Sequence, residues 1–305
     1  MLLRLLFPVL FTSAYLLGQG PSGSLTGTIT DRSDSVINGA TITATNAATG
    51  VNFKTTTSSG VYNFPSLPPG KYSLRAEFTG FEVQVVRDIP LEIGARLQYN
   101  FKLEPGSIAT AVEVSAANDA LINTVVSSIG GVVSGQKVLN LPVVSRNALN
   151  FTTLQAGTVG GNFAGARIGS LNITIDGINV QDNRINLGVS STVTASVDII
   201  EEFRVITSPA DVEYGRGSGQ IQARTRSGGN AFHGSLFELH RNTVLNANTW
   251  FNNQRGSDRN GNPISPRDRL VNNNFGGKIG GPILRNRTFF SLQLRGHPSG
   301  HTQLR

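Results

Sequence analysis

The chain of 305 residues is long enough for two or three domains, and it contains 35 glycines, 15% charged residues and no cysteine. Many glycines and few charges disfavour a helical bundle, and the absence of cysteine excludes disulfides and thiolate metal sites. Abundant Thr, Val, Ile, Ser and Asn favour strands and turns. The composition therefore predicts a mainly β protein, and a large β fold without disulfides is compatible with the bacterial cell envelope.

The net charge of +7 is unevenly distributed along the chain. Residues from Arg204 onward hold 14 Lys and Arg against 5 Asp and Glu, whereas the preceding residues have a net charge of −2. A basic half can bind nucleic acid, but these arginines are isolated among Asn and Gly, without a basic run or a basic helix. We therefore expect no nucleic-acid partner, and we interpret the basic half as a solvated loop surface or a polar pore lining.

The first twenty residues have the parts of a secretory signal. The basic residue Arg4 precedes an uncharged apolar stretch, residues 5–17, and small residues follow it. This stretch is shorter than the ~20 residues that a membrane-spanning helix needs. We expect residues 1–20 to be a signal peptide that directs export; a buried core strand is the alternative.

Residues 22–104 contain several short segments in which apolar and polar residues alternate. Alternation with a period of two gives each segment one apolar face, as in half-buried antiparallel strands. Turn pairs such as Asn38-Gly39 separate the segments. Short strands at this spacing predict a small β-sandwich. The alternating segments are residues 23–30, 40–45, 72–78 and 97–103.

The segment from Ser59 to Leu74, with the turn Pro68-Pro69-Gly70 and the later Thr79-Gly80-Phe81, resembles the carboxypeptidase regulatory-like domain. The resemblance implies a prealbumin-like β-sandwich, a fold shared with carbohydrate-binding modules. Its aromatic residues could stack on sugars, but their strand-like alternation favours core packing. No carbohydrate site follows from the fold alone. The aromatic residues concerned are Tyr62, Phe64, Tyr72 and Phe78.

Residues 105–228 contain short motifs in a fixed order. They are Asn140-Leu-Pro with Arg146-Asn147, Ile175-Asp-Gly, Ile200-Glu-Glu-Phe-Arg-Val, Glu213-Tyr-Gly-Arg-Gly-Ser-Gly and Thr225-Arg-Ser-Gly-Gly-Asn. Their order resembles the plug domain of TonB-dependent outer-membrane receptors. The nearest variety is the Oar-like type, which places a regulatory-like sandwich before the plug. The resemblance implies an α+β plug domain that fills a barrel and gates entry of a ligand.

Three local patterns in this region predict local structure. Asp176-Gly177 predicts a tight turn within a strand segment, and the spacing of Asp198 and Glu201 resembles a capping box, which predicts the start of a short helix. The glycine cluster at 215–219 lacks the Lys-Ser/Thr ending of a phosphate loop and the third glycine of a dinucleotide fingerprint. We expect its glycines to form a tight turn against the barrel wall.

The same resemblance implies a TonB box, a short segment that pairs as a strand with a TonB-type energy transducer. Residues 111–116 are an extended, valine-rich candidate, and such a segment suits strand addition to a partner. An ordinary linker or a first plug strand is the alternative. The residues assigned to partner binding are Val112, Glu113, Val114, Ser115 and Ala116.

Residues 229–290 resemble the start of an outer-membrane β-barrel. Residues 230–242, 274–283 and those from Asn286 onward fit three strands. In the second, Phe275, Ile279 and Ile283 share one face and Lys278 lies on the other, as expected when one face meets lipid and the other the lumen. These three strands form the third predicted domain region, after the sandwich and the plug.

The family pattern is lost at residues 291–305, which we expect to be an atypical tail that follows a truncation. Receptors of this type resemble barrels of ~22 strands, and the 77 residues from position 229 allow about four or five strands. An open set of strands leaves unpaired edges, which lipid does not tolerate. We therefore expect an incomplete barrel and a chain that does not transport by itself.

No arrangement of residues predicts catalysis or metal binding. His297 and His301 have the spacing of two metal ligands on a helix, but Pro298 and Gly300 prevent a helix there. A nucleophile elbow, a His-Glu zinc motif and a paired carboxylate site are all absent from the sequence. We expect no enzyme activity, no cofactor and no metal.

The leading hypothesis is a truncated TonB-dependent receptor, whose family imports a ligand across the outer membrane in an energy-dependent way. The ligand is an unknown small molecule or oligosaccharide, and the partners are the transducer and the outer membrane. The expected location is the outer membrane, or the periplasm for a truncated product. The alternative is a periplasmic or surface β-sandwich module that binds glycan or protein.

Overall fold

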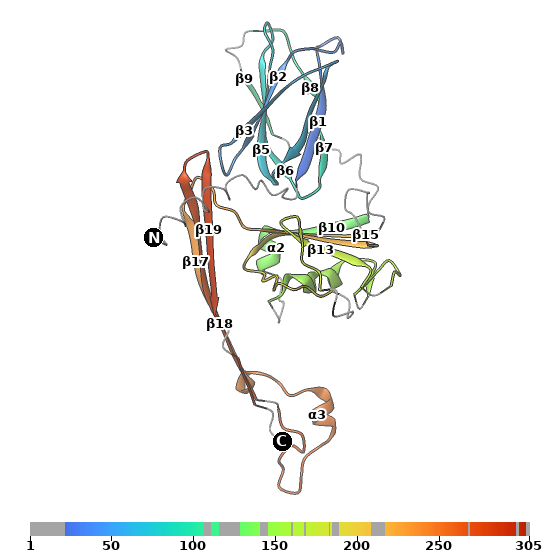
Figure 1. Ribbon diagram of the computed structural model, residues 1–305, viewed down its shortest axis with the longest axis vertical. Helices are drawn as coiled ribbons and strands as arrows, with labels where there is room; N and C mark the ends of the chain where they lie inside the picture. The colour runs from blue at the N-terminus through green and yellow to red at the C-terminus, as the bar shows by residue number, and fades with distance from the viewer. Residues whose placement is uncertain are drawn as a thin grey trace, which may run out of the picture. The chain divides into compact units, whose positions relative to one another are not determined.

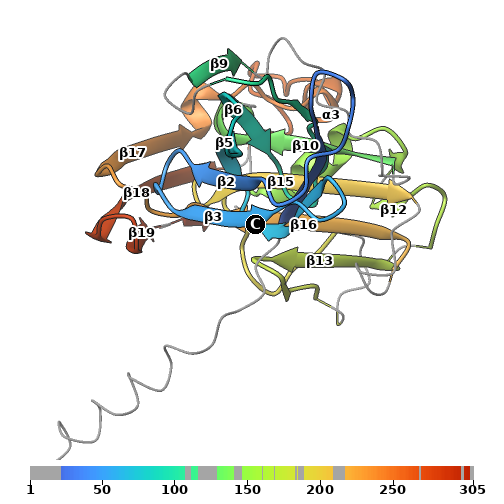
Figure 2. The same ribbon diagram turned by 90° about the horizontal axis from the view of Figure 1, so that it is seen from above.

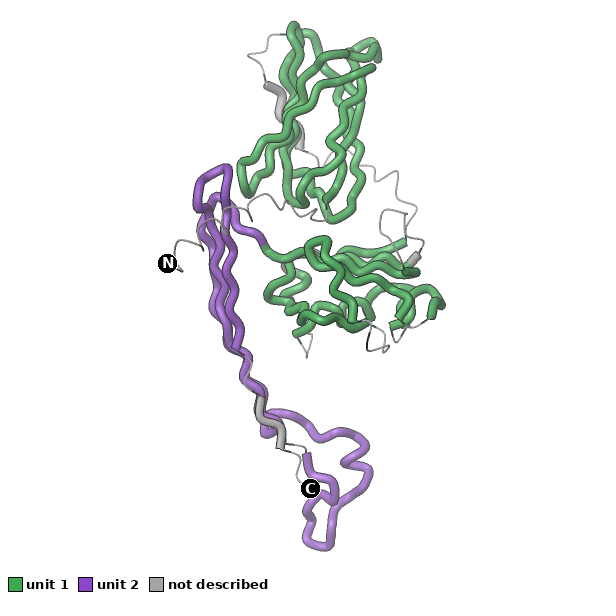
Figure 3. Tube along the Cα trace, in the orientation of Figure 1, with its two compact units in different colours: residues 1–226 green, residues 227–305 purple. Residues whose placement is uncertain are grey.

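A computed structural model describes residues 22–106, 111–115, 129–140, 146–159, 161–167, 169–182, 184, 189–208, 217–267, 269–296 and 299–302. The chain divides into two compact units, Met1–Arg226 and Ser227–Arg305 (Figure 3). Strands predominate in both units, which confirms the predicted fold class. The expected signal peptide lies outside the described residues. In the part of the chain that is described, helices long and apolar enough to cross a bilayer are absent.

The first part of unit 1 is a β-sandwich made of two sheets around one core (Figure 1). One sheet has the order β4-β1-β7, with β8 also paired to β1, and the other has the order β3-β2-β5-β6-β9. The predicted alternating strands are confirmed, although the last of them is divided into β7 and β8. The strands are β1 (Gly23–Thr30), β2 (Thr41–Asn46), β3 (Asn52–Thr56), β4 (Val61–Leu67), β5 (Gly70–Glu77), β6 (Val83–Leu91), β7 (Arg96–Gln98), β8 (Phe101–Lys102) and β9 (Ala111–Ser115).

The sandwich core contains the aromatic residues that sequence analysis assigned to packing. Tyr62, Phe64 and Tyr72 are buried, and Phe78 packs against the same core while partly exposed. The Tyr62 hydroxyl donates to the Tyr99 carbonyl at 2.6 Å, which satisfies its polar group inside the core. The prediction of core packing is therefore confirmed for the three buried rings.

The second part of unit 1 is a five-stranded sheet with the order β10-β15-β16-β13-β14, called here the plug sheet (Figure 2). Its apolar face is covered by the helical segments α2 and η2, whose Val138, Leu149 and Phe151 share one buried cluster with Phe203 and Ile221 of the sheet. The elements are β10 (Ile129–Ser134), α2 (Gly135–Asn140), η2 (Ala148–Leu154), β11 (Thr158–Val159), β12 (Asn162–Phe163), β13 (Leu171–Ile175), β14 (Ile178–Asn179), β15 (Ile200–Ser208) and β16 (Gly219–Thr225).

Two of the three local predictions in this region can be judged directly. The turn at Asp176-Gly177 is confirmed, since both residues have positive φ and connect β13 to β14. The helix predicted from Asp198 is wrong, because residues 197–199 form a turn and β15 begins at Ile200. The Asp198 carboxylate binds the Arg146 guanidinium and accepts a hydrogen bond from the Ser196 hydroxyl instead of capping a helix.

The glycine cluster makes close backbone contacts within the plug sheet. Gly217 has a φ of +100°, and a Cβ there would lie 3.1 Å from the Ser170 carbonyl oxygen. A Cβ on Gly219 would lie 2.6 Å from the Phe163 ring. Glycine is therefore favoured at both positions by the segment that precedes β13 and by Phe163 of β12, a reason that does not involve a barrel wall.

Unit 2 is an antiparallel sheet with the order β17-β18-β19, and β20 also pairs with β18. The three predicted strands are confirmed, and Phe275 and Ile279 lie on the opposite face of β18 from Lys278. Leu236, paired with Gly277, is 90% exposed on the apolar face. The elements are β17 (His233–Asn242), η4 (Thr243–Leu245), α3 (Trp250–Gln254), β18 (Arg269–Leu284), β19 (Thr288–Gly296) and β20 (Ser299–Thr302).

The atypical tail expected from residue 291 is corrected for the described part of that segment. β19 continues to Gly296 in register with β18, and residues 299–302 form β20. Leu292 and Leu294 alternate with Gln293 and Arg295, so the pattern of a two-faced strand continues past Phe290.

Gly27 of β1 offers a test of the sandwich packing. A Cβ at this position would lie 1.7 Å from the Tyr99 carbonyl oxygen, so we expect Gly27→Ala to force the two strands apart and destabilise the sandwich by about 1–3 kcal/mol. Hydrogen exchange of sandwich peptides measures this loss. Thr28→Ala, in the same strand, is the control, and equal protection in the two variants would contradict the packing described here.

The Arg146–Asp198 ion pair offers a test of the plug-sheet structure. The side chains are 21% and 11% exposed, so Asp198→Ala leaves a largely buried guanidinium unpaired, and we expect a loss of about 3 kcal/mol. Hydrogen exchange of residues 146–154 is the measurement. Arg146→Met combined with Asp198→Ala is expected to recover part of the loss, and a double variant as unprotected as Asp198→Ala would rule out the pair as the cause.

Candidate functional site

The candidate partner-binding segment is an edge strand of the sandwich. β9 pairs in parallel with β6, with Val83 opposite Ala111 and Arg87 opposite Ser115. It ends the sheet order β3-β2-β5-β6-β9, so among the described strands only one of its two edges is paired. Residues 111–115 were placed in the plug region from sequence, and the structure places them in the sandwich sheet instead.

Four of the five residues predicted to bind a partner are in this strand. Val112, Glu113 and Val114 lie opposite Gln84, Val85 and Val86 of β6. Ser115 closes the ladder, and Ala116 lies outside the described residues. The backbone N–H and C=O groups on the open edge of such a strand can accept another extended segment. The arrangement can therefore bind a peptide through main-chain hydrogen bonds.

A second site lies where the sandwich meets the polar face of the plug sheet. Glu202 and Arg204 are two residues apart on β15, so both side chains project from the same face, opposite to buried Phe203. The Ile93 N–H donates to Glu202 Oε1 at 2.9 Å, and Arg204 Nη1 donates to the Ile93 carbonyl at 2.7 Å. Two charged side chains thus bind both polar groups of one sandwich residue.

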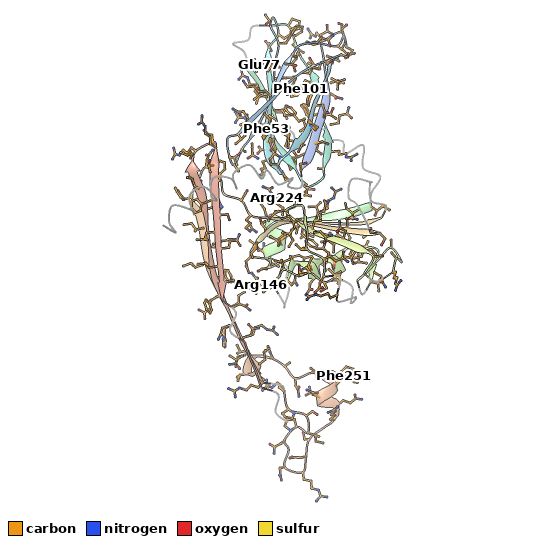
Figure 4. All side chains as sticks on the ribbon, viewed as in Figure 1. Phe53, Glu77, Phe101, Arg146, Arg224 and Phe251 are labelled. Carbon is orange, nitrogen blue, oxygen red and sulfur yellow. The ribbon has the colours of Figure 1, made fainter. Side chains whose placement is uncertain are left out.

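Arg224 extends this contact to a second loop of the sandwich. It lies opposite Glu202 in the β15–β16 ladder, and its Nη1 donates to the Pro69 carbonyl at 2.8 Å. Its Nη2 is 3.7 Å from Glu201 Oε2. Figure 4 labels Arg224 between the sandwich and the plug sheet. Pro69 belongs to the Pro68-Pro69-Gly70 turn, so this turn also contacts the plug sheet.

The environment of Glu202 favours its neutral form. Burial raises the pKa of this carboxyl from 4.5 to about 7, although the hydrogen bond from the Ile93 N–H lowers it. The nearby charges of Glu92 and Glu201 raise the pKa further, and Arg224 lowers it. A carboxyl that is only 6% exposed therefore changes charge near neutral pH.

Sequence reasoning did not identify Glu202, Arg204 or Arg224 as interface residues. The signal was present, because charged residues at alternating positions on a strand with buried Phe203 and Val205 define a second face that needs partners. The sequence does not indicate where the sandwich loops lie. The Ile93 N–H and carbonyl groups that bind Glu202 and Arg204 are more than a hundred residues away in the chain.

The described residues hold no group of three or more His, Cys, Asp or Glu side chains arranged to bind a metal. His297 lies outside the described residues, and only the strand position of His301 is described.

Comparisons with known proteins match two separate parts of the chain. Residues 24–104 match the carboxypeptidase regulatory-like domain, and residues 224–303 match an outer membrane beta barrel domain. The TonB-dependent transporter Oar of Myxococcus xanthus is 28% identical over 250 residues, which are 77% of this chain and 23% of that protein. The chain thus spans about a quarter of this relative.

Solved structures show weaker likenesses. The siderophore receptor PirA of Acinetobacter baumannii is 19% identical, with 56% of this chain and 24% of that chain covered and a TM-score of 0.35. A Bacteroides uniformis protein proposed to bind carbohydrate is 26% identical, with 28% and 43% covered and a TM-score of 0.24. Because both scores are low, the assignment depends on the sequence matches alone. By those matches the chain is a homologue of the TonB-dependent transporter Oar, with a match to a carboxypeptidase regulatory-like domain at residues 24–104 and to an outer membrane beta barrel domain at residues 224–303.

Proposed function

We propose that this chain is the sandwich, plug and first barrel strands of an outer-membrane receptor that imports a ligand under the control of a TonB-type transducer. The observation that carries this proposal is β9, which follows the sandwich in sequence and forms an edge strand of its sheet in a homologue of a TonB-dependent transporter. The match of residues 224–303 to an outer membrane beta barrel domain supports a location in that membrane.

The transducer would bind β9 by strand addition. One edge of β9 is paired to β6, and the other has no partner among the described strands. Main-chain pairing supplies affinity without demanding particular side chains, and alternate side chains supply specificity. The partner can add to the open edge or replace β6, and both routes need the N–H groups of residues 111–115.

The proposed ligand is a small molecule or an oligosaccharide that the plug admits to the periplasm. The competing proposal, a glycan-binding module, needs accessible aromatic faces on the sandwich. Tyr62, Phe64 and Tyr72 are buried in the core, so these three rings are not free to stack on a sugar, whereas Phe78 is partly exposed. The burial of three of the four candidate rings supports the receptor over the module.

Proline in β9 tests the proposed transducer contact. In a full-length receptor with these residues, Glu113→Pro together with Val114→Pro removes one N–H from each edge of the strand, because successive N–H groups point to opposite sides. We expect site-specific crosslinking from residue 112 to the purified periplasmic domain of a TonB-type transducer to fall at least about tenfold.

The matched control places the same change on the opposite edge of the same sheet. Phe53→Pro with Lys54→Pro in β3 perturbs a strand of similar length, and we expect transducer crosslinking to persist in that variant. Crosslinking that survives proline in β9, or that is lost equally in both variants, would contradict the assignment of β9 as the contact.

We further propose that residues 1–305 alone do not transport. In the described part of unit 2, β17 and β19 pair only with β18, so each has an unpaired edge that a bilayer does not tolerate. With the 305-residue chain reconstituted in lipid vesicles, we expect solute flux equal to that of empty vesicles. Flux at the level of a full-length receptor, measured in parallel, would refute this proposal.

A further inference from the structure

The contact between the sandwich and the plug sheet depends on charged side chains binding main-chain groups. Glu202 and Arg204 bind the N–H and carbonyl of Ile93, and Arg224 binds the carbonyl of Pro69. Ile93 is 1% exposed, and Glu202 and Arg204 are 6% and 8% exposed. Removing water from two guanidinium groups and a carboxyl group is costly unless each finds a partner, and these main-chain contacts supply those partners.

We propose that Glu202, Arg204 and Arg224 form a proton-sensitive latch that holds the sandwich on the plug sheet through the Ile93 and Pro69 loops. The two loops lie in different turns of the sandwich, one before β5 and one after β6, so together they restrict rotation as well as separation. Because the bound groups belong to the main chain, the contact depends on the backbone conformation of the two turns and not on the side chains of Ile93 and Pro69.

The charges around Glu202 decide the direction of the pH response. From the sandwich the carboxyl faces the Ile93 N–H and the charge of Glu92; from the plug sheet it faces Glu201, Arg204 and Arg224. The two neighbouring carboxylates oppose the two guanidiniums, so their combined charge does little to stabilise a negative charge on buried Glu202. Desolvation therefore dominates, and the neutral carboxyl suits the latched state.

The pH response follows from this linkage. When the sandwich leaves the plug sheet, Glu202 meets water and regains its ordinary pKa of 4.5, whereas in the latched state its pKa is about 7. The latched state therefore binds the proton more tightly. Latching is strongest below pH 4.5, weakens as the pH rises to 7, and is constant above that value, with a total change on the order of a hundredfold in the docking equilibrium.

A chain without cysteine allows this equilibrium to be measured directly. Cysteines introduced at exposed Lys54 of the sandwich and Leu154 of the plug region carry a spin-label pair on the full 305-residue chain. Pulsed electron resonance then gives the distribution of label distances between pH 4.5 and 8.5. We expect one narrow distance in acid and an added broad component above pH 7.

Glu202→Gln separates the latch from a general effect of pH. The amide is neutral at every pH and can still accept the Ile93 N–H, so we expect a narrow distance throughout the pH range. Arg204→Gln, which weakens the hold on the Ile93 carbonyl, is expected to broaden the distribution at every pH. Glu77→Gln and Arg75→Gln are matched controls, because that exposed pair lies within β5 and makes its 3.1 Å contact inside the sandwich.

Each outcome decides the proposal. A distribution in the parent chain that does not change with pH would overturn it, and so would a Glu202→Gln chain that broadens at high pH as the parent does. Hydrogen exchange of the sandwich and plug peptides in the same samples distinguishes undocking from unfolding, because undocking leaves the protection of both cores unchanged. Loss of core protection in step with the distance change would also count against the latch.

Discussion

The arrangement of unit 1 depends on two ionisable side chains of one strand, Glu202 and Arg204, binding the main chain of one residue, Ile93. Glu202 accepts from the Ile93 N–H and Arg204 donates to the Ile93 carbonyl, and both side chains are buried. A buried guanidinium or carboxyl group without a hydrogen-bond partner would be costly, and the Ile93 main chain supplies a partner for each. The apolar face of the same strand packs through Phe203 against α2 and η2. One strand thereby connects the plug core to the sandwich.

The contact between β15 and the sandwich also determines what a partner bound to β9 could act on. The strand follows the sandwich in sequence and completes its sheet, yet in a receptor it would be the segment that an energy transducer binds. A transducer acting on β9 would therefore act on the sandwich, whose loops hold the plug sheet at Ile93 and Pro69. Because the polar interface and the edge strand belong to the same sandwich, the proposed transducer contact would be connected to the plug sheet through the sandwich.

Where sequence reasoning failed, a tertiary contact had changed the role of a local signal. Asp198 has the spacing of a helix cap, but Arg146 and Ser196 bind its carboxylate and a turn replaces the helix. Residues 111–115 follow the Pro105-Gly106 boundary, but they return to pair with β6. Residues 291–296 were expected to form an atypical tail, but the match to an outer membrane beta barrel domain extends to residue 303 and β19 continues on β18 to Gly296. Local preferences are weak beside pairing and burial.

The sequence by itself determined the mainly β class, the sandwich with its aromatic core, the hairpin at Asp176-Gly177 and the two-faced strands after residue 229. These features follow from alternation and turn chemistry, which act over a few neighbouring residues. It also placed a strand-forming segment at residues 111–115. Only the tertiary structure decided which sheet that segment joins and which groups Glu202, Arg204 and Arg224 bind. The partners of those residues lie far away in the chain, and no local pattern specifies a main-chain carbonyl at Pro69 or Ile93.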